Sequence, residues 1–89
     1  NLYELEKEIS EIDNPTLIIN GDEDDMCLEV GFFLKRTIKT SGLLIVPKTG
    51  HTINLEEPAL FNYHLSEFYA SINASKWVQR DKRAGIIKL

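Results

Sequence analysis

At 89 residues the chain has the length of one small domain, and its hydrophobic fraction of 43% and charged fraction of 27% are those of a globular protein, not a disordered one. Fourteen acidic residues against ten basic ones leave a net charge of −4, which argues against nucleic acid or an anionic membrane as a partner. A single cysteine, Cys27, excludes an internal disulfide. The longest apolar run is far shorter than the ~20 residues of a membrane helix. We therefore expect a cytoplasmic protein.

The first residues predict the end of an amphipathic helix. Apolar side chains recur at helical spacing among acidic ones, at Leu2, Leu5, Ile9 and Ile12. Asn14-Pro15 ends this pattern, because the residue before a proline is pushed out of the α region. The pattern opens abruptly, as if the helix were part of something longer.

Two short apolar runs predict buried strands, at residues 16–20 and 43–46. Gly21 closes the first run and Pro47 closes the second. A helical pattern over residues 28–39 lies between them, with Ser41-Gly42 as its break. Strands that are apolar on both faces and alternate with helices are typical of a parallel sheet covered on each side. The predicted fold class is therefore α/β.

A third helix and a basic tail complete the pattern. Pro58 stands where a first-turn proline belongs, after Glu56 and Glu57. An apolar stripe at three-to-four spacing follows, formed by Leu60, Phe61, Leu65, Phe68, Tyr69 and Ile72. We divide the chain into a folded segment, 1–75, and a basic C-terminal tail, 76–89. Within the tail we expect Trp77 to dock on the body, and Arg80 and Arg83 to cap the preceding helix or pair with its acids.

Polar side chains follow both predicted strands. An acidic loop, residues 22–25, follows the first strand, and a loop over residues 48–54 that carries His51 follows the second. Because the carboxyl ends of parallel strands meet at one edge of a sheet, the two loops should lie side by side. A carboxylate there can accept the Nδ1–H of the imidazole and fix its tautomer and orientation.

The same stretches carry a resemblance to a known family. Residues 15–24 run from an apolar strand into Gly-x-x-Asp, and residues 46–58 join a strand, a Gly-His loop and a Glu-x-Pro helix start. With the helix over 61–68, this order is similar to the C-terminal portion of α/β-hydrolases, in unbroken register over residues 13–72. The resemblance implies that His51 is the general base of a catalytic triad and that Asp24 is the acid that orients it. It implies no cofactor.

The sequence departs from this family in lacking a nucleophile. It contains no Gly-x-Ser-x-Gly, and its serines do not stand at a strand-to-helix elbow. Without a nucleophile and oxyanion donors, an aspartate–histidine pair has nothing to activate. We therefore interpret the chain as a C-terminal fragment of a serine-type hydrolase of esters or related bonds. Its partners would be the N-terminal part of that enzyme, or a second copy of itself, and a small-molecule substrate.

Two other functions stay open. One is a non-catalytic binding module that kept the hydrolase shape, and the other is an unrelated two-strand α/β domain of flavodoxin-like kind, which the absence of a glycine-rich phosphate loop disfavours. We expect Asp22, Glu23 and Asp25 to be solvated, and Cys27 and His64 to serve packing. No metal site is expected, because the acidic loop lacks EF-hand spacing and no HExxH motif is present.

Overall fold

A computed structural model describes residues 1–84 of the chain, so the end of the predicted basic tail, 85–89, lies outside the described residues. In chain order the elements are the 3₁₀ helix η1 (Leu2–Leu5), α1 (Glu6–Ser10), β1 (Thr16–Gly21), α2 (Asp25–Thr37), β2 (Ser41–Val46), α3 (Ile53–Glu56) and α4 (Pro58–Asn73). Strands alternate with helices, which confirms the predicted α/β class. Within residues 1–84, no helix is both long and apolar enough to cross a membrane.

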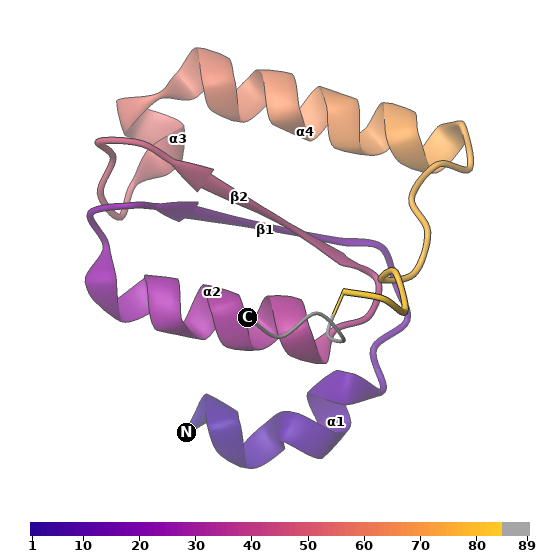
Figure 1. Cartoon of the computed structure of the whole chain (residues 1–89). Helices are drawn as coiled ribbons and strands as arrows, with labels where there is room; N and C mark the ends of the chain where they lie inside the picture. Colours follow the sequence, from indigo (N-terminus) through magenta and orange to yellow (C-terminus); the bar gives the residue numbers. More distant parts are fainter. Residues whose placement is uncertain (85–89) are drawn as a thin grey trace.

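The two strands are parallel neighbours, as predicted. Their register runs from Thr16 opposite Ser41 to Gly21 opposite Val46, so both strands end at the same level. Helix α2 covers one face of the sheet with α1 beyond it, and α4 lies over the other face (Figure 1). The short helix α3 lies beside the carboxyl ends of the strands. This layering places the loops after β1 and β2 together at one edge.

The strands are less buried than the sequence predicted. Every residue of β1 before Gly21 is only half-buried, and Ile45 of β2 is 38% exposed. Each strand has one strand neighbour in the described chain, so the outer edge of each is left without a ladder partner. The buried hydrophobic residues of the described chain come from four different segments and are Ile9, Ile38, Val46 and Ile53.

Several predicted boundaries were wrong, for local reasons. Helix α2 begins at Asp25 instead of residue 28, because the carbonyl of Asp24 already accepts the backbone N–H groups of Cys27 and Leu28. It ends at Thr37, since Ile38 is extended (φ −91°, ψ 106°) and turns inward to become 4% exposed. Ser41-Gly42, expected to break the helix, forms the start of β2 instead. The first helical segment ends at Ser10, well before Asn14-Pro15.

At the amino ends of the strands, the start of the tail returns to the sheet (Figure 1, yellow). The Trp77 Nε1–H donates to the carbonyl of Thr40 at 2.6 Å, and its ring meets the Phe68 ring edge-on, with centroids 4.7 Å apart. The ring also fills the space where Gly42 has no Cβ. The expected docking of Trp77 is thus confirmed. Arg83 instead pairs with Asp81, inside the tail, at 2.8 Å.

Candidate active site

A close approach of two loops builds the site, and Gly21 permits it. A Cβ on Gly21 would collide with the carbonyl oxygens of Thr49 and Gly50. The backbone N–H of Glu23 donates to the Thr49 carbonyl at 3.0 Å, and the N–H of Asp22 donates to Val46 at 2.9 Å. These bonds join the loop after β1 to the end of β2 and the loop that follows it. They bring the next side chains of the two loops, Asp24 and His51, toward each other.

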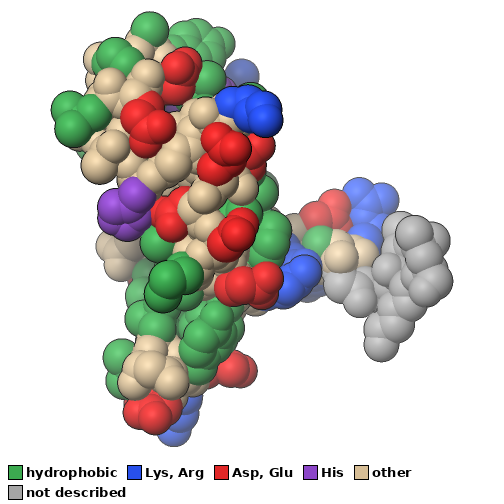
Figure 2. All heavy atoms as spheres, turned by 90° about the vertical axis from the view of Figure 1, so that its left-hand side faces the viewer, with side chains coloured by type: hydrophobic (Ala, Val, Ile, Leu, Met, Phe, Trp, Pro, Cys, Tyr) green, Lys and Arg blue, Asp and Glu red, His purple; other side chains and the backbone are tan. Residues whose placement is uncertain are grey.

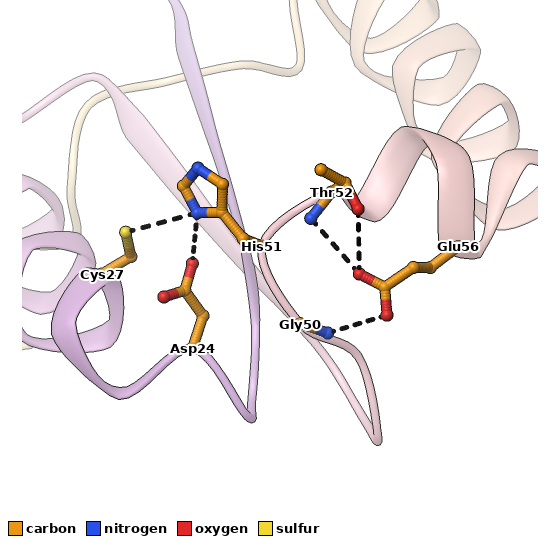
Figure 3. A network of polar contacts seen from close by, with 6 residues as sticks. All are labelled: Asp24, Cys27, Gly50, His51, Thr52 and Glu56. Atoms are coloured by element: carbon orange, nitrogen blue, oxygen red, sulfur yellow. Dashed lines mark hydrogen bonds and ion pairs between the residues drawn. The ribbon is translucent and has the colours of Figure 1, made fainter.

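Asp24 and His51 meet at this edge, as the sequence predicted. His51 Nδ1 lies 2.7 Å from Asp24 Oδ2 (Figure 3). Asp24 is the N-cap residue of α2, yet its side chain makes no cap bond to the helix. It therefore forgoes the usual role of an N-cap aspartate and faces the imidazole instead. The Asp24 side chain is 18% exposed, whereas that of His51 is 78% exposed.

The electrostatics of the pair define the tautomer of His51. The hydrogen bond from His51, followed by one from the Cys27 thiol, lowers the pKa of Asp24 below its ordinary value. An ionised carboxylate can only accept, so Nδ1 carries the proton that is donated to Asp24. In the neutral form of this ring, the second nitrogen, Nε2, carries the free lone pair. It points away from both Asp24 and Cys27 in Figure 3.

Cys27 is part of this cluster, which corrects its expected role as a buried packing residue. It is only half-buried, and its Sγ lies 3.8 Å from His51 Nδ1. The hydrogen bond that it donates to Asp24, followed by burial, raises the pKa of the thiol. A thiol held in its protonated form beside Nδ1 is on the wrong side of the ring to be a nucleophile activated at Nε2.

Glu56 is a site residue that the sequence analysis missed. Its carboxylate accepts the N–H of Gly50 at 3.1 Å, the N–H of Thr52 at 3.2 Å and the Thr52 hydroxyl at 3.3 Å (Figure 3). These donors flank His51 in the chain, so one side chain clamps the loop on both sides of the imidazole. The Glu-x-Pro motif contained this residue, but we had interpreted it only as a charge at a helix start.

The other acids of the first loop divide into two kinds. Asp22, expected to be solvated, accepts the backbone N–H of Thr49 at 3.3 Å and so helps to join the loops. Glu23 and Asp25 are exposed, as expected. Figure 2, which looks at the molecule from the side of the strands' carboxyl ends, shows acidic side chains over much of this face. His64 is half-buried on α4 and meets the Tyr63 ring edge-on.

This arrangement provides an oriented base at an open edge of the sheet. The carboxylate holds the imidazole and can stabilise the imidazolium, while Nε2 can take a proton from a group that approaches from solvent. Asp24, Cys27 and His51 also offer a carboxylate oxygen, a sulfur and a nitrogen within 4.8 Å of one another. The sequence predicted no metal site, and these three groups are the specific candidates for one.

Comparisons with known proteins give two matches, although no family model matches the chain. A Bacillus subtilis (strain 168) protein named as a 2-succinyl-6-hydroxy-2,4-cyclohexadiene-1-carboxylate synthase is 39% identical over 64 residues, which are 72% of this chain and 23% of that protein. The structure of MenH from S. aureus matches with a TM-score of 0.73 and 28% identity, over 75% of this chain and 25% of its own.

The chain thus spans about a quarter of the length of each relative. MenH has an α/β-hydrolase fold. The agreement in sequence and in fold confirms the resemblance that the Gly-x-x-Asp and Gly-His motifs predicted. In sequence and in fold, the chain resembles part of an α/β-hydrolase.

Proposed function

We propose that Asp24 and His51 are the acid and the general base of a serine-type catalytic triad in an α/β-hydrolase-fold enzyme. The observation that carries this proposal is the 2.7 Å bond between Nδ1 and Oδ2, at the edge where both strands end. It leaves Nε2 pointing away from the acid (Figure 3). That is the arrangement in which an imidazole can accept a proton from a nucleophile.

In the proposed mechanism His51 Nε2 takes the proton of a serine hydroxyl as the oxygen attacks the substrate. Asp24 stabilises the imidazolium that forms, and the same proton then passes to the leaving group. The serine and the oxyanion donors would come from a segment outside these 89 residues. The match to only a quarter of each relative supports this division. The chain by itself would then be inactive.

The partner of the chain would be that N-terminal segment, and in its absence a second copy of the chain. The two-stranded sheet has an outer edge on each strand, and exposed strand edges favour pairing with another chain. Sedimentation of the isolated chain should therefore show self-association that increases with concentration. A monomer at all concentrations would argue against an incomplete sheet that needs a partner.

Two reactions are candidates for the complete enzyme. One is hydrolysis of an ester or a related bond, the chemistry usual for a serine triad. The second is formation of 2-succinyl-6-hydroxy-2,4-cyclohexadiene-1-carboxylate, the activity for which the Bacillus relative is named, and the 39% identity favours it. In both, we assign His51 the role of the base and the substrate is a small molecule.

The test compares turnover by the full-length protein, its His51→Ala variant and the isolated 89-residue chain. Each is assayed for hydrolysis of a p-nitrophenyl ester and for formation of the cyclohexadiene carboxylate. We expect the full-length protein to catalyse one reaction, and both the variant and the isolated chain to be inactive. His64→Ala is the matched control, because it removes the other histidine, on α4, and should keep near-full activity. Full activity of His51→Ala would refute the triad, and turnover by the isolated chain would refute the need for a second segment.

We also propose that the enzyme works in the cytoplasm. Cys27 is a free thiol beside the candidate site, and thiols are kept reduced in that compartment. Cell fractionation should recover the protein with soluble cytoplasmic enzymes. Recovery from the cell exterior would contradict this location without affecting the triad.

A further inference from the structure

One cluster in the described chain brings three kinds of metal-binding atom together. His51 Nδ1 lies 3.8 Å from Cys27 Sγ and 2.7 Å from Asp24 Oδ2, and all three groups fall within 4.8 Å of one another. Asp24 is the N-cap residue of α2, Cys27 lies in the first turn of that helix, and His51 lies in the loop after β2. From this geometry we propose that Asp24, Cys27 and His51 form a binding site for Zn²⁺.

The spacing of the donors fits a tetrahedral ion. Zinc bonds of roughly 2.0–2.3 Å at tetrahedral angles place neighbouring donor atoms about 3.3–3.7 Å apart. The observed distance between sulfur and Nδ1 is already close to this value. The distance between Nδ1 and Oδ2 is shorter and must open by roughly half an ångström. A rotation of the exposed His51 side chain is enough for that, because this ring is 78% exposed.

The donor set selects zinc over the hard cations. Ca²⁺ and Mg²⁺ prefer six or more oxygen ligands, whereas one thiolate, one imidazole and one carboxylate suit a borderline-soft ion. Three protein ligands leave a fourth position for water, and the cluster is accessible to solvent through His51, which is 78% exposed. The site therefore has the composition of an open zinc site rather than a closed structural one.

Occupation of this site would switch off the base, a consequence that rests on the proposed function. Zinc on Nδ1 displaces the proton that this nitrogen donates to Asp24, and the neutral ring then carries its proton on Nε2. Cys27 binds as the thiolate and releases its own proton to solvent. Nε2–H cannot accept a proton from a nucleophile. Zinc would thus act as an inhibitor of the enzyme and would play no part in the reaction.

The test uses the full-length protein and Co²⁺, which replaces Zn²⁺ and gives a visible signature with a thiolate ligand. We expect one cobalt per protein with a sulfur-to-cobalt charge-transfer band, which added Zn²⁺ removes. Cys27→Ser should abolish the band, and His51→Gln should weaken cobalt binding at least tenfold. Asp25→Asn is the matched control, because this exposed acid of the same loop lies outside the cluster, and it should bind like the wild type.

The results separate the metal site from the proposed activity. Absence of the band in the wild type, its survival in Cys27→Ser, or unchanged affinity in His51→Gln would each overturn the zinc site. Zn²⁺ should also inhibit turnover by the wild type at concentrations at least tenfold below those that inhibit Cys27→Ser. Equal inhibition would show that zinc acts elsewhere. If cobalt binds as expected while His51→Ala remains active, the triad is wrong and the metal site stands.

Discussion

The two ends of the sheet are held together in different ways. At the amino end, an aromatic ring and backbone bonds connect distant segments, since Trp77 bonds Thr40 and the N–H of Arg80 donates to Lys39 at 2.6 Å. At the carboxyl end, the loops are joined by a backbone approach at Gly21, and two ionisable side chains meet there, Asp24 at 18% and His51 at 78% exposure. Both ends are packed, since the most fully buried side chains, Val46 and Thr49, lie at the carboxyl end. The groups capable of chemistry gather on top of that packed end.

Side-chain hydrogen bonds show the same contrast. At the amino end Lys35 donates to the carbonyl of Ser41, Thr40 to that of Asn14 and the Ser41 hydroxyl to that of Ile38, each at 2.7 Å. These bonds satisfy backbone groups at chain turns. At the carboxyl end Asp24 leaves α2 without a side-chain cap and holds His51 instead. At the candidate site an aspartate that could cap a helix is thus used to orient a histidine.

The largest expected effect of breaking the carboxyl end is on catalysis. Asp24→Asn in the full-length protein should lower kcat by a factor of about 10⁴, because the amide leaves His51 in the wrong tautomer. Steady-state kinetics on the substrate of the complete enzyme measure this effect. Asp22→Asn and Asp25→Asn should change kcat little, since neither residue contacts the imidazole. If Asp22→Asn or Asp25→Asn inactivates the enzyme while Asp24→Asn does not, Asp24 is the wrong acid.

Gly21→Ala should disrupt the same end through the backbone. The new methyl group would meet the carbonyl oxygens of Thr49 and Gly50, which cannot move without shifting the His51 loop. We expect a loss of about 2–3 kcal/mol in the free energy of unfolding, measured by urea denaturation, together with a lower kcat. Gly50→Ala is the control, because the nearest atom to a Cβ there would be a Glu56 carboxylate oxygen at 3.3 Å, whereas a Cβ on Gly21 would collide with backbone oxygens. Equal stability of the two variants would show that the loops do not depend on this approach.

Trp77→Ala tests the amino end. The ring packs on Phe68 and bonds Thr40 but is only half-buried, so we expect a loss of about 2 kcal/mol, less than for a fully buried tryptophan. The kcat of the folded enzyme should be unchanged, because no atom of the site is touched. Val78→Ala, at a position that is 73% exposed, should be neutral. A large fall in kcat for Trp77→Ala would show that the two ends are coupled.

The smallest expected effect is that of pH on the contact between Asp24 and His51. The folded state lowers the pKa of Asp24 below its ordinary value of 3.8. This contact therefore contributes stability above that value and loses it as the pH falls through the lowered pKa. The stability difference between the wild type and Asp24→Asn should accordingly vanish in strong acid. If this stability difference instead grew on acidification, folding would raise the pKa of Asp24 and not lower it.

Several features were determined by the sequence alone. The apolar runs ending at Gly21 and Pro47 predicted two strands, and parallel neighbours necessarily bring their following loops to one edge. The spacing of Gly-x-x-Asp and Gly-His then indicated Asp24 and His51 as the pair. These predictions succeeded because each depends on a local pattern or on a general rule of sheet topology. The catalytic roles of the pair, and the division into 1–75 and 76–89, stay predictions.

Other features were decided only by the tertiary structure. Cys27 stands three residues after Asp24, a spacing that places both on one side of a helix, but it was informative only once α2 was known to begin at Asp25. Glu56 acts on the loop around His51, and Trp77 on the start of β2. Such contacts join segments that local patterns treat separately. They depend on how closely two backbones approach and on which way a helix is turned, and both are set by packing.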